Sequence, residues 1–362
     1  MNAKLEHIFE KANRLEQLSS EEVEYLLGLN EKDADALFEF ARYLRERFFG
    51  KKVFLYGFVY FSTWCRNDCT FCYYRRSNIE SIRYRKTKEE VLDAAYRLAE
   101  SGVHLIDLTL GEDPLFYDHH GGFEILIDLV EELKRRIRLP IMISPGVVPE
   151  YVLKEFAIAG ADWYACYQET HNERLFQELR VNQSYKQRLI NKIKALKYGL
   201  LIEEGILAGI GESSSDIVVS TQYMRQLGAH QVRVMSFIPQ KGTPLEKWPT
   251  PSRLWELKII AVLRLLFPDR LIPASLDIDG VAGLQKRINA GANVITSLIP
   301  PQLGLAGVAQ STKDIDEGYR TVQGILPLLE KMNLSPAELE DYQRWVNCAK
   351  DQIKNNKRGA CP

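Results

Sequence analysis

The sequence predicts an α/β protein whose centre is a (β/α)8 barrel. Between residues 51 and 311, short apolar runs bounded by turn residues alternate with helix-like runs. Eight such strand–helix pairs follow one another, and no second half repeats the first. Helical segments flank this region. We therefore expect an N-terminal helical extension at 1–50, the barrel at 51–311 and C-terminal capping helices at 312–362.

The first fifty residues are charged and helical in pattern. Ser19 and Glu22 form a capping box for a helix that continues to Leu29. A second helix is expected at 33–49, where Gly50 ends it. We expect these helices to pack on the outside or the bottom of the barrel, without a role in the chemistry.

Strand-like runs set the order of the barrel. The first strand begins at Val53 and continues through an aromatic stretch at 56–64. Further strands are expected at 104–110, 141–144, 163–168, 201–208, 231–238, 271–276 and 294–299, and Pro300 and Pro301 close the last one. Helices are expected at 87–102, 121–136, 149–159, 253–267 and 282–289, with helical pieces up to Lys197 after the fourth strand. In such barrels the carboxyl ends of the strands form the active site, so polar residues there are candidates for function.

Composition and charge exclude several classes of protein. Of the 362 residues, 46% are hydrophobic, which is enough for a large core. Lys and Arg number 47 and Asp and Glu 48, and this balance argues against a nucleic-acid binder, which carries a basic surplus. No apolar segment has the pattern of a signal peptide or the length of a membrane span, so we expect a cytoplasmic protein.

The six cysteines fit a reducing compartment better than a disulfide framework, because three of them are clustered. The other three are scattered along the chain. We expect each of these to be a buried or unpaired thiol: Cys166, Cys348 and Cys361.

Cys65, Cys69 and Cys72 form a C-x3-C-x2-C pattern directly after the first strand. Three cysteines so close on one loop can turn their sulfurs to a common point, and thiolate sulfur suits iron–sulfur clusters, zinc and Cu(I). Three ligands on a cubane leave one iron open to a small molecule with amino and carboxylate donors. The alternatives are a zinc site or three ordinary buried cysteines. Structural zinc prefers four ligands, and no second Cys or His pair completes such a set.

This cysteine pattern, with an aromatic residue before its last member, resembles that of the radical S-adenosylmethionine (SAM) superfamily. Two further segments resemble landmarks of that family. Residues 110–114 correspond to its Gly-Gly-Glu segment, with Leu110 for the first glycine, and 205–212 fit its G-x-I-x-G-x-x-E pattern, with Leu207 for Ile. An ordinary strand-to-loop turn is the alternative for the first segment. The resemblance implies a 4Fe–4S cluster on the three cysteines and SAM on the open iron.

The same resemblance implies which residues contact SAM. The backbone of Gly111 and Glu112 is expected to meet the methionine amino group, and Glu169, after the fourth strand, to accept hydrogen bonds from the ribose. Arg180 and Arg188 are expected to pair with the SAM carboxylate through charge-assisted bonds. For each arginine alone, a solvated charge on a helix surface is the alternative.

Charged residues interrupt three of the apolar strands, at Asp107, Arg233 and Asp277. A charge buried in a barrel is costly unless it is paired. Either these residues pair with one another, or the charges of a ligand complete the pairing. One arginine suits one carboxylate and two aspartates suit two ammonium groups, which describes a diamino acid of lysine or ornithine size. We expect depressed carboxylate pKa values when such a ligand is bound.

Several short segments give a closer resemblance, to the methylornithine synthases of the pyrrolysine pathway. They lie at 60–63, 141–146, 167–170, 232–235, 271–277 and 289–293. The resemblance implies a lysine mutase that makes (3R)-3-methyl-D-ornithine from L-lysine. In such an enzyme a 5′-deoxyadenosyl radical takes a hydrogen from the lysine side chain, and the Cα–Cβ bond then fragments and rejoins at the neighbouring carbon. The implied substrate contacts are Asp107, Ser144, Arg233, Ser275, Asp277, Thr296 and Ser297.

The resemblance also implies an external one-electron donor such as a flavodoxin or ferredoxin. Biotin synthase and the hydrogenase-maturation radical SAM enzyme are alternative enzymes with the same barrel. Biotin synthase needs a second cluster, and only Cys166 lies on a later strand, whereas Arg233 with two aspartates separates a mutase from a maturase. A non-catalytic iron–sulfur or SAM-binding sensor is the alternative from another class, and it needs no charged barrel interior.

Overall fold

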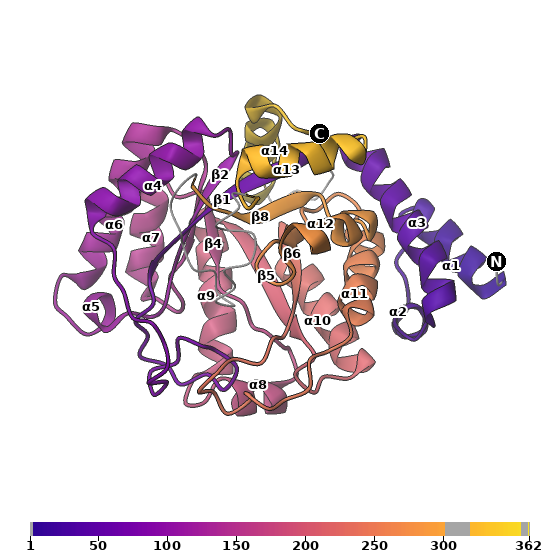
Figure 1. Cartoon of the computed structure of the whole chain (residues 1–362), viewed down its shortest axis with the longest axis horizontal. Helices are drawn as coiled ribbons and strands as arrows, with labels where there is room; N and C mark the ends of the chain where they lie inside the picture. The colour runs from indigo at the N-terminus through magenta and orange to yellow at the C-terminus, as the bar shows by residue number, and fades with distance from the viewer. Residues whose placement is uncertain (1–2, 301–318, 356–360, 362) are drawn as a thin grey trace.

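Eight parallel strands form a nearly closed barrel in this computed structural model, which describes residues 3–300, 319–355 and Cys361 (Figure 1). Their hydrogen-bonded order is β6-β5-β4-β3-β2-β1-β8-β7. A bridge between Gln231 and Leu271 brings the two ends of this order together, and the amide of Val232 donates to the Leu271 carbonyl over 3.0 Å. The predicted fold class is confirmed. The strands are β1 (Lys52–Ser62), β2 (Leu105–Leu110), β3 (Ile141–Ser144), β4 (Trp163–Ala165), β5 (Leu201–Ala208), β6 (Gln231–Ser236), β7 (Pro273–Ser275) and β8 (Val294–Leu298).

Helices surround this barrel on its outer face (Figure 1). Thr87 opens the first of them with a capping box: its side chain accepts from the amide of Glu90, whose carboxylate accepts from the amide of Thr87. None of the described helices has the length and apolar content that a membrane span requires. The helices after the strands are α4 (Lys88–Glu100), α5 (Pro114–Tyr117), α6 (Gly122–Ile137), α7 (Glu150–Ile158), α8 (Glu173–Leu179), α9 (Tyr185–Lys197), α10 (Ser214–Leu227), α11 (Arg253–Leu266) and α12 (Gly280–Asn289).

Several features of the barrel differ from the sequence-based expectation. Strand β6 ends at Ser236 instead of residue 238, and β7 covers only Pro273–Ser275 of the predicted 271–276. No range was predicted for helix α10, although Ser213 and Asp216 form a capping box at its start. Strand β4 ends at Ala165, three residues before the predicted end. The reason is a local irregularity at Glu169, which has a φ of 67° and returns to β5 through a bridge to Ile206.

The N-terminal helices lie against the side of the barrel. They are α1 (Ala3–Asn13), α2 (Ser20–Leu27) and α3 (Glu31–Phe49), and α3 packs on α11 and α12. The predicted capping box is confirmed, because the Ser19 hydroxyl accepts from the amide of Glu22 over 3.2 Å. Helix α3 begins two residues before the predicted start, since the Asn30 side chain caps it.

The C-terminal elements close the bottom of the barrel. After α13 (Val322–Lys331), the short strand β9 (Ser335–Pro336) pairs with the start of β1, and α14 (Leu339–Lys354) follows. On α14, Trp345 stacks on Trp163 with 5.9 Å between ring centroids, and the Tyr342 hydroxyl lies 2.7 Å from that of Tyr56. These contacts seal the amino ends of the strands. The predicted boundary at 311–312 and Pro301 lie outside the described residues.

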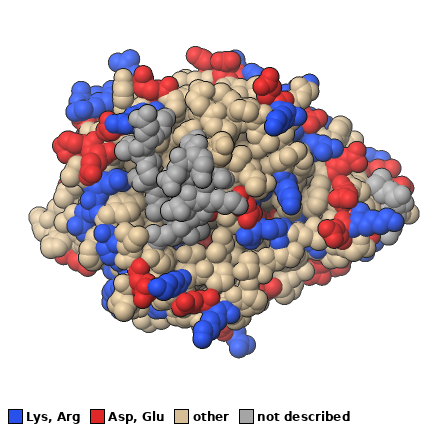
Figure 2. Space-filling view, in the orientation of Figure 1, with Lys and Arg blue, Asp and Glu red and all other residues tan. Residues whose placement is uncertain are grey.

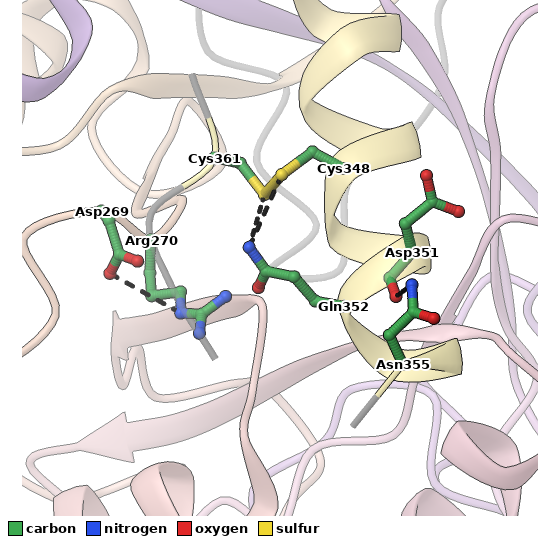
Figure 3. The surroundings of a disulfide bond; sticks show 7 residues. All are labelled: Asp269, Arg270, Cys348, Asp351, Gln352, Asn355 and Cys361. Carbon is green, nitrogen blue, oxygen red and sulfur yellow. Dashed lines mark hydrogen bonds and ion pairs between the residues drawn. A yellow bond between two sulfur atoms is a disulfide. The ribbon is translucent and has the colours of Figure 1, made fainter. Parts of the chain in front are cut away.

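Cys348 on α14 and Cys361 form a disulfide (Figure 3). The expectation of two unpaired thiols is therefore wrong. Cys361 lies beside α14 with its Cα atom 5.7 Å from that of Cys348, and sequence spacing alone does not reveal this proximity. The amide of Gln352 donates to the Cys361 sulfur over 3.2 Å. Cys166 is buried and unpaired, as expected.

Charged side chains of both signs are interspersed over the face in view in Figure 2, in keeping with the near-balanced composition.

The packing of α14 against the amino ends of the strands, here called the bottom plug, contributes to the stability of the barrel. Replacing Trp345 with alanine is expected to lower the free energy of unfolding by about 3–5 kcal/mol, because a fully buried, stacked indole leaves a cavity. Denaturant unfolding followed by circular dichroism measures this change. The matched control is the exposed Tyr43→Ala, and equal effects of the two substitutions would contradict the proposed role of the plug.

Candidate functional site

A cavity opens at the carboxyl ends of the strands, where the sequence placed the active site. It encloses about 830 Å³, open solvent at its mouth included, which is within the usual range for ligand pockets. Cys72 lines one side of it, and apolar side chains form much of the wall. Six of the seven predicted substrate residues line it: Asp107, Ser144, Arg233, Asp277, Thr296 and Ser297.

The cysteine loop is held in place by buried polar contacts of its backbone. Arg83 donates to the carbonyls of Thr63 and Arg75 over 2.5 Å each, which ties the two ends of the loop together. The amide of Gly111 donates to the Ser62 carbonyl at the end of β1. A Cβ at Gly111 would lie 2.2 Å from the Trp64 carbonyl oxygen, so only glycine fits there.

The three predicted cluster cysteines lie close enough on this loop for their thiols to influence one another electrostatically. Gln183 donates to the buried sulfur of Cys69 over 3.0 Å, and an Arg180 nitrogen lies 3.6 Å from it. Burial, together with the charge of Cys69, raises the pKa of Cys65 to about 11, and burial and both other thiols raise that of Cys72 further. A bound metal centre supplies the positive charge that reverses such shifts.

The donor set fits a cluster better than a single ion. In the described part of the chain, no three His, Cys, Asp or Glu side chains gather closely enough for one metal ion. Each thiolate of an iron–sulfur cubane binds a different iron, so the sulfurs stand further apart than on zinc. The hydrogen bonds to Cys69 suit a thiolate in such a cluster, since second-shell donors tune it.

Glu112 lies beside the cysteine loop rather than in the main cavity. Its carboxylate accepts from the amide of Val147 and from Arg66, each over 3.1 Å, and its carbonyl accepts from the Arg66 amide. Arg188 lies 3.9 Å from the same carboxylate. Glu112 therefore connects the end of β2 to the residue that follows Cys65, and its neighbour Gly111 connects it to the end of β1.

Glu169 lines the cavity and pairs with Arg180 over 2.5 Å. Burial raises its pKa, and the charge of Arg180 offsets part of this rise. Arg188 donates to the Tyr167 carbonyl over 2.7 Å. Both arginines are buried, so neither is a solvated charge on a helix surface. The Nε of Arg180 has no hydrogen-bond partner, which leaves a buried donor near the cysteines.

Arg233 reaches into the cavity from β6. Its Nε donates to Glu203 over 2.6 Å, while its Nη2 is buried without a partner. Glu203 also accepts from Tyr167 and Gln231, over 2.7 and 2.6 Å. Sequence reasoning missed Glu203, although two adjacent glutamates in an otherwise apolar strand were visible. The unpartnered Nη2 is a donor that a ligand carboxylate can satisfy.

Asp277 pairs with Arg320 over 2.6 Å and accepts from the Ser297 hydroxyl over 2.8 Å. Arg320 was not predicted, because it lies beyond the barrel strands and no motif marks it. Ser275 lies behind the cavity wall, where its hydroxyl is 3.1 Å from that of Ser297. Thr296 Oγ1 is buried without a partner.

Asp107 accepts from the Thr109 hydroxyl over 3.0 Å. Burial, followed by repulsion from Glu203, raises the pKa of Asp107 to about 7, and Arg233 opposes this rise. On the neighbouring strand β3, Ser144 lies in register with Thr109 and donates to the Ala165 carbonyl over 3.3 Å. Asp107 thus has no cationic side chain hydrogen-bonded to it in the described part of the chain.

The ion pairs in the cavity differ from the expectation that Asp107, Arg233 and Asp277 pair either with one another or with a ligand. Each guanidinium has a carboxylate partner already, Arg233 with Glu203 and Arg320 with Asp277. Asp107 is the third carboxylate of this group. Among the described residues of this group, carboxyl groups therefore exceed guanidinium groups by one.

Comparison with known proteins agrees with this geometry. The model of the radical SAM superfamily matches residues 59–224. The chain is 42% identical to 3-methylornithine synthase of Methanosarcina acetivorans over 333 residues. This alignment covers 92% of this chain and 94% of that protein. It is 30% identical to the FeFe-hydrogenase maturase subunit HydE of Thermotoga maritima, over 80% of this chain and 82% of the relative.

The solved structures give the same result. The crystal structure of methylornithine synthase (PylB) matches with a TM-score of 0.88 at 42% identity, covering 93% of this chain and 99% of that one. Both the sequence and the fold are thus shared over nearly the whole length. The chain belongs to the radical SAM superfamily and, within it, to the family of the methylornithine synthases.

Proposed function

We propose that this protein is a radical SAM mutase that converts L-lysine into (3R)-3-methyl-D-ornithine for pyrrolysine biosynthesis. The names of its relatives support the product. The choice of L-lysine as the substrate is supported by the charge of the cavity. Carboxyl groups exceed guanidinium groups by one, and one arginine nitrogen has no hydrogen-bond partner. L-lysine has two ammonium groups and one carboxylate, so its net positive charge balances this excess.

Each end of lysine has matching groups in this proposal. The carboxylate binds Nη2 of Arg233, and the α-ammonium binds Asp107, whose charge interacts with that of the same arginine. The ε-ammonium lies near Asp277 and Ser297, with Arg320 holding the aspartate in place. Thr296 adds a hydroxyl that needs a partner.

The remaining wall positions the substrate and excludes water. Cys65, Cys69 and Cys72 would hold the cluster, which together with SAM would supply the radical chemistry that removes a hydrogen atom from the lysine side chain and restores it. Apolar side chains surround this space and keep water away from the reacting carbon atoms. Those lining the cavity are Phe58, Phe71, Leu207, Met235, Phe237 and Ile238.

Anaerobic turnover tests this function. The protein, reconstituted with iron and sulfide, is incubated with SAM, a reductant and one of three compounds: L-lysine, norleucine or cadaverine. Only L-lysine is expected to give a product of equal mass with a different retention time, because norleucine lacks the second ammonium group and cadaverine lacks the carboxylate. Equal turnover of all three compounds would contradict the charge argument. A maturase would cleave SAM without isomerising lysine.

Lysine binding is expected to release a proton from Asp107 under mildly acidic conditions. The pKa of this carboxyl is raised to about 7 in the free protein, and an ammonium group beside it lowers the pKa. Below this pKa the free carboxyl keeps its proton and the complex does not, so the affinity falls by up to about tenfold for each pH unit of acidification. Calorimetric titration in two buffers of different ionisation enthalpy measures the proton release.

The control for this prediction is Asp107→Asn, which has no proton to lose. In this variant, lysine binding should be weak and should depend far less on pH. If the wild-type protein binds lysine equally well on both sides of this pKa, the role given to Asp107 is wrong.

A further inference from the structure

The surface above the cysteine loop exposes large apolar side chains. Trp64, Ile79 and Ile82 are 44%, 94% and 61% exposed, and contiguous exposed groups of this kind mark interaction sites. The Ile82 carbonyl accepts from the Thr63 hydroxyl over 3.0 Å, so this residue lies beside the segment that carries Trp64. We call the following residues the loop face: Trp64, Ile79 and Ile82, with Arg76, Arg83 and Arg85.

The loop face is also basic. Between residues 64 and 86 the chain has six Lys and Arg against two Asp and Glu, whereas the whole chain has a net charge of −1. Arg76 and Arg85 pair with Asp68 and Asp113. The guanidinium of Arg83 donates to backbone carbonyls, and no carboxylate within the described residues pairs with it. The carboxylates of Glu112, Asp113 and Asp118, from other segments, pair with Arg66 and Arg85, and Lys241 pairs with Glu80. With these groups included, the surface has seven cations against five carboxylates, a positive surplus of two.

This face adjoins the cysteine loop, because Arg83 donates to the carbonyls of Thr63 and Tyr74 on either side of the three cysteines. Trp64 precedes Cys65, and its ring lies 5.9 Å from the guanidinium carbons of both Arg83 and Arg85. An electron reaches a buried metal centre efficiently only over a short distance. A redox partner that approaches the three cysteines from outside the barrel meets this surface.

We propose that the loop face is the docking surface of a small acidic one-electron carrier protein. The inference rests on the proposed function, because a reductively started enzyme needs such a partner. For a flavin carrier, the anionic hydroquinone loses one electron and becomes the neutral semiquinone, while the oxidised cluster gains this electron. Apolar contacts at the centre provide affinity, and the surrounding cations attract an acidic surface and orient it.

Two double variants of the reconstituted enzyme test this surface. Ile79→Glu with Ile82→Glu places acidic groups at its centre without touching a cysteine. The matched control is Ile125→Glu with Ile158→Glu, at positions 51% and 67% exposed on the outer helices α6 and α7. The probe is a flavodoxin of net negative charge. Calorimetry with its oxidised form gives Kd, and turnover is started in parallel with its hydroquinone or with dithionite.

The loop-face variant is expected to weaken flavodoxin binding and flavodoxin-driven turnover by about tenfold or more, since repulsion replaces apolar contact. Dithionite-driven turnover should stay unchanged, and the control variant should match the wild type in every assay. Wild-type Kd should rise with ionic strength.

The proposal is overturned if both double variants bind flavodoxin equally well, or if wild-type enzyme shows no saturable binding. It is also overturned if the wild-type enzyme sediments as a dimer and the loop-face variant as a monomer, because the loop face would then be the interface between two copies of this chain. Failure of the mutase proposal is distinguishable, because dithionite would then yield no lysine isomer while the calorimetric comparison still tests docking.

Discussion

Changing Arg233 to methionine together with Glu203 to glutamine is expected to lower kcat/KM for L-lysine by about 100- to 1,000-fold, which corresponds to about 3–4 kcal/mol. The double change removes the donor that faces the substrate carboxylate. It also removes the carboxylate that pairs with Arg233, so no uncompensated charge is left behind and the cavity keeps its negative excess. Anaerobic steady-state kinetics measures the loss.

Cadaverine provides the control for this experiment, because it lacks the carboxylate. Its binding should be similar in the wild type and the double variant, and SAM binding should be unchanged. A loss for cadaverine as large as that for lysine would indicate a distorted site. Lysine turnover that remains at the wild-type level would show that Arg233 does not hold the carboxylate.

Replacing Cys72 with alanine is expected to abolish SAM cleavage. Three thiolates are the protein ligands proposed for the cluster, and Cys72 is the one that lines the substrate cavity. Without it the cluster loses one of its three protein ligands, so iron content and the broad visible absorption should both fall. Iron analysis, absorbance and assay of 5′-deoxyadenosine measure these effects on the same sample.

The matched control is Cys166→Ala, because Cys166 is also buried and free. This variant should keep its iron and its activity. A Cys72→Ala protein with wild-type iron and absorption would remove Cys72 from the ligand set, and a Cys166→Ala protein without iron would add Cys166 to it.

Much of the barrel could be predicted because its strands are short apolar runs between turn residues. Strands β3 and β5 match their predicted bounds. Strand β9, with two residues, carries no pattern of its own, and its pairing with β1 depends on where α13 and α14 pack. The disulfide between Cys348 and Cys361 has the same origin, since only the fold brings these residues together.

The residues that line the cavity could be predicted where their position on a barrel strand determines that they face the interior. Asp107, Arg233 and Asp277 lie on or next to inward-facing strand positions and line one cavity. Their ion-pair partners were not predictable, because Arg320 is remote in sequence from Asp277. Glu203 and Glu204 could have been noted as charges in an apolar strand, but only the structure shows that they face different parts of the protein.

The side chains of these two glutamates point to opposite faces of β5, because successive side chains alternate along a strand. Glu203 accepts from Tyr167 and Arg233 inside the barrel, whereas its neighbour Glu204 pairs with Lys192 of α9. The first belongs to the substrate cavity and the second to the packing of a helix on the barrel. The residue type is the same, so the sequence does not separate the two roles.

The most direct test of the account uses uniformly carbon-13-labelled L-lysine with SAM, reductant and the reconstituted enzyme in the absence of oxygen. Carbon-13 NMR of the product reports which carbons are bonded. The account predicts a branched diamino acid with a new methyl group and every labelled carbon retained. Lysine that stays unbranched while 5′-deoxyadenosine accumulates would contradict it.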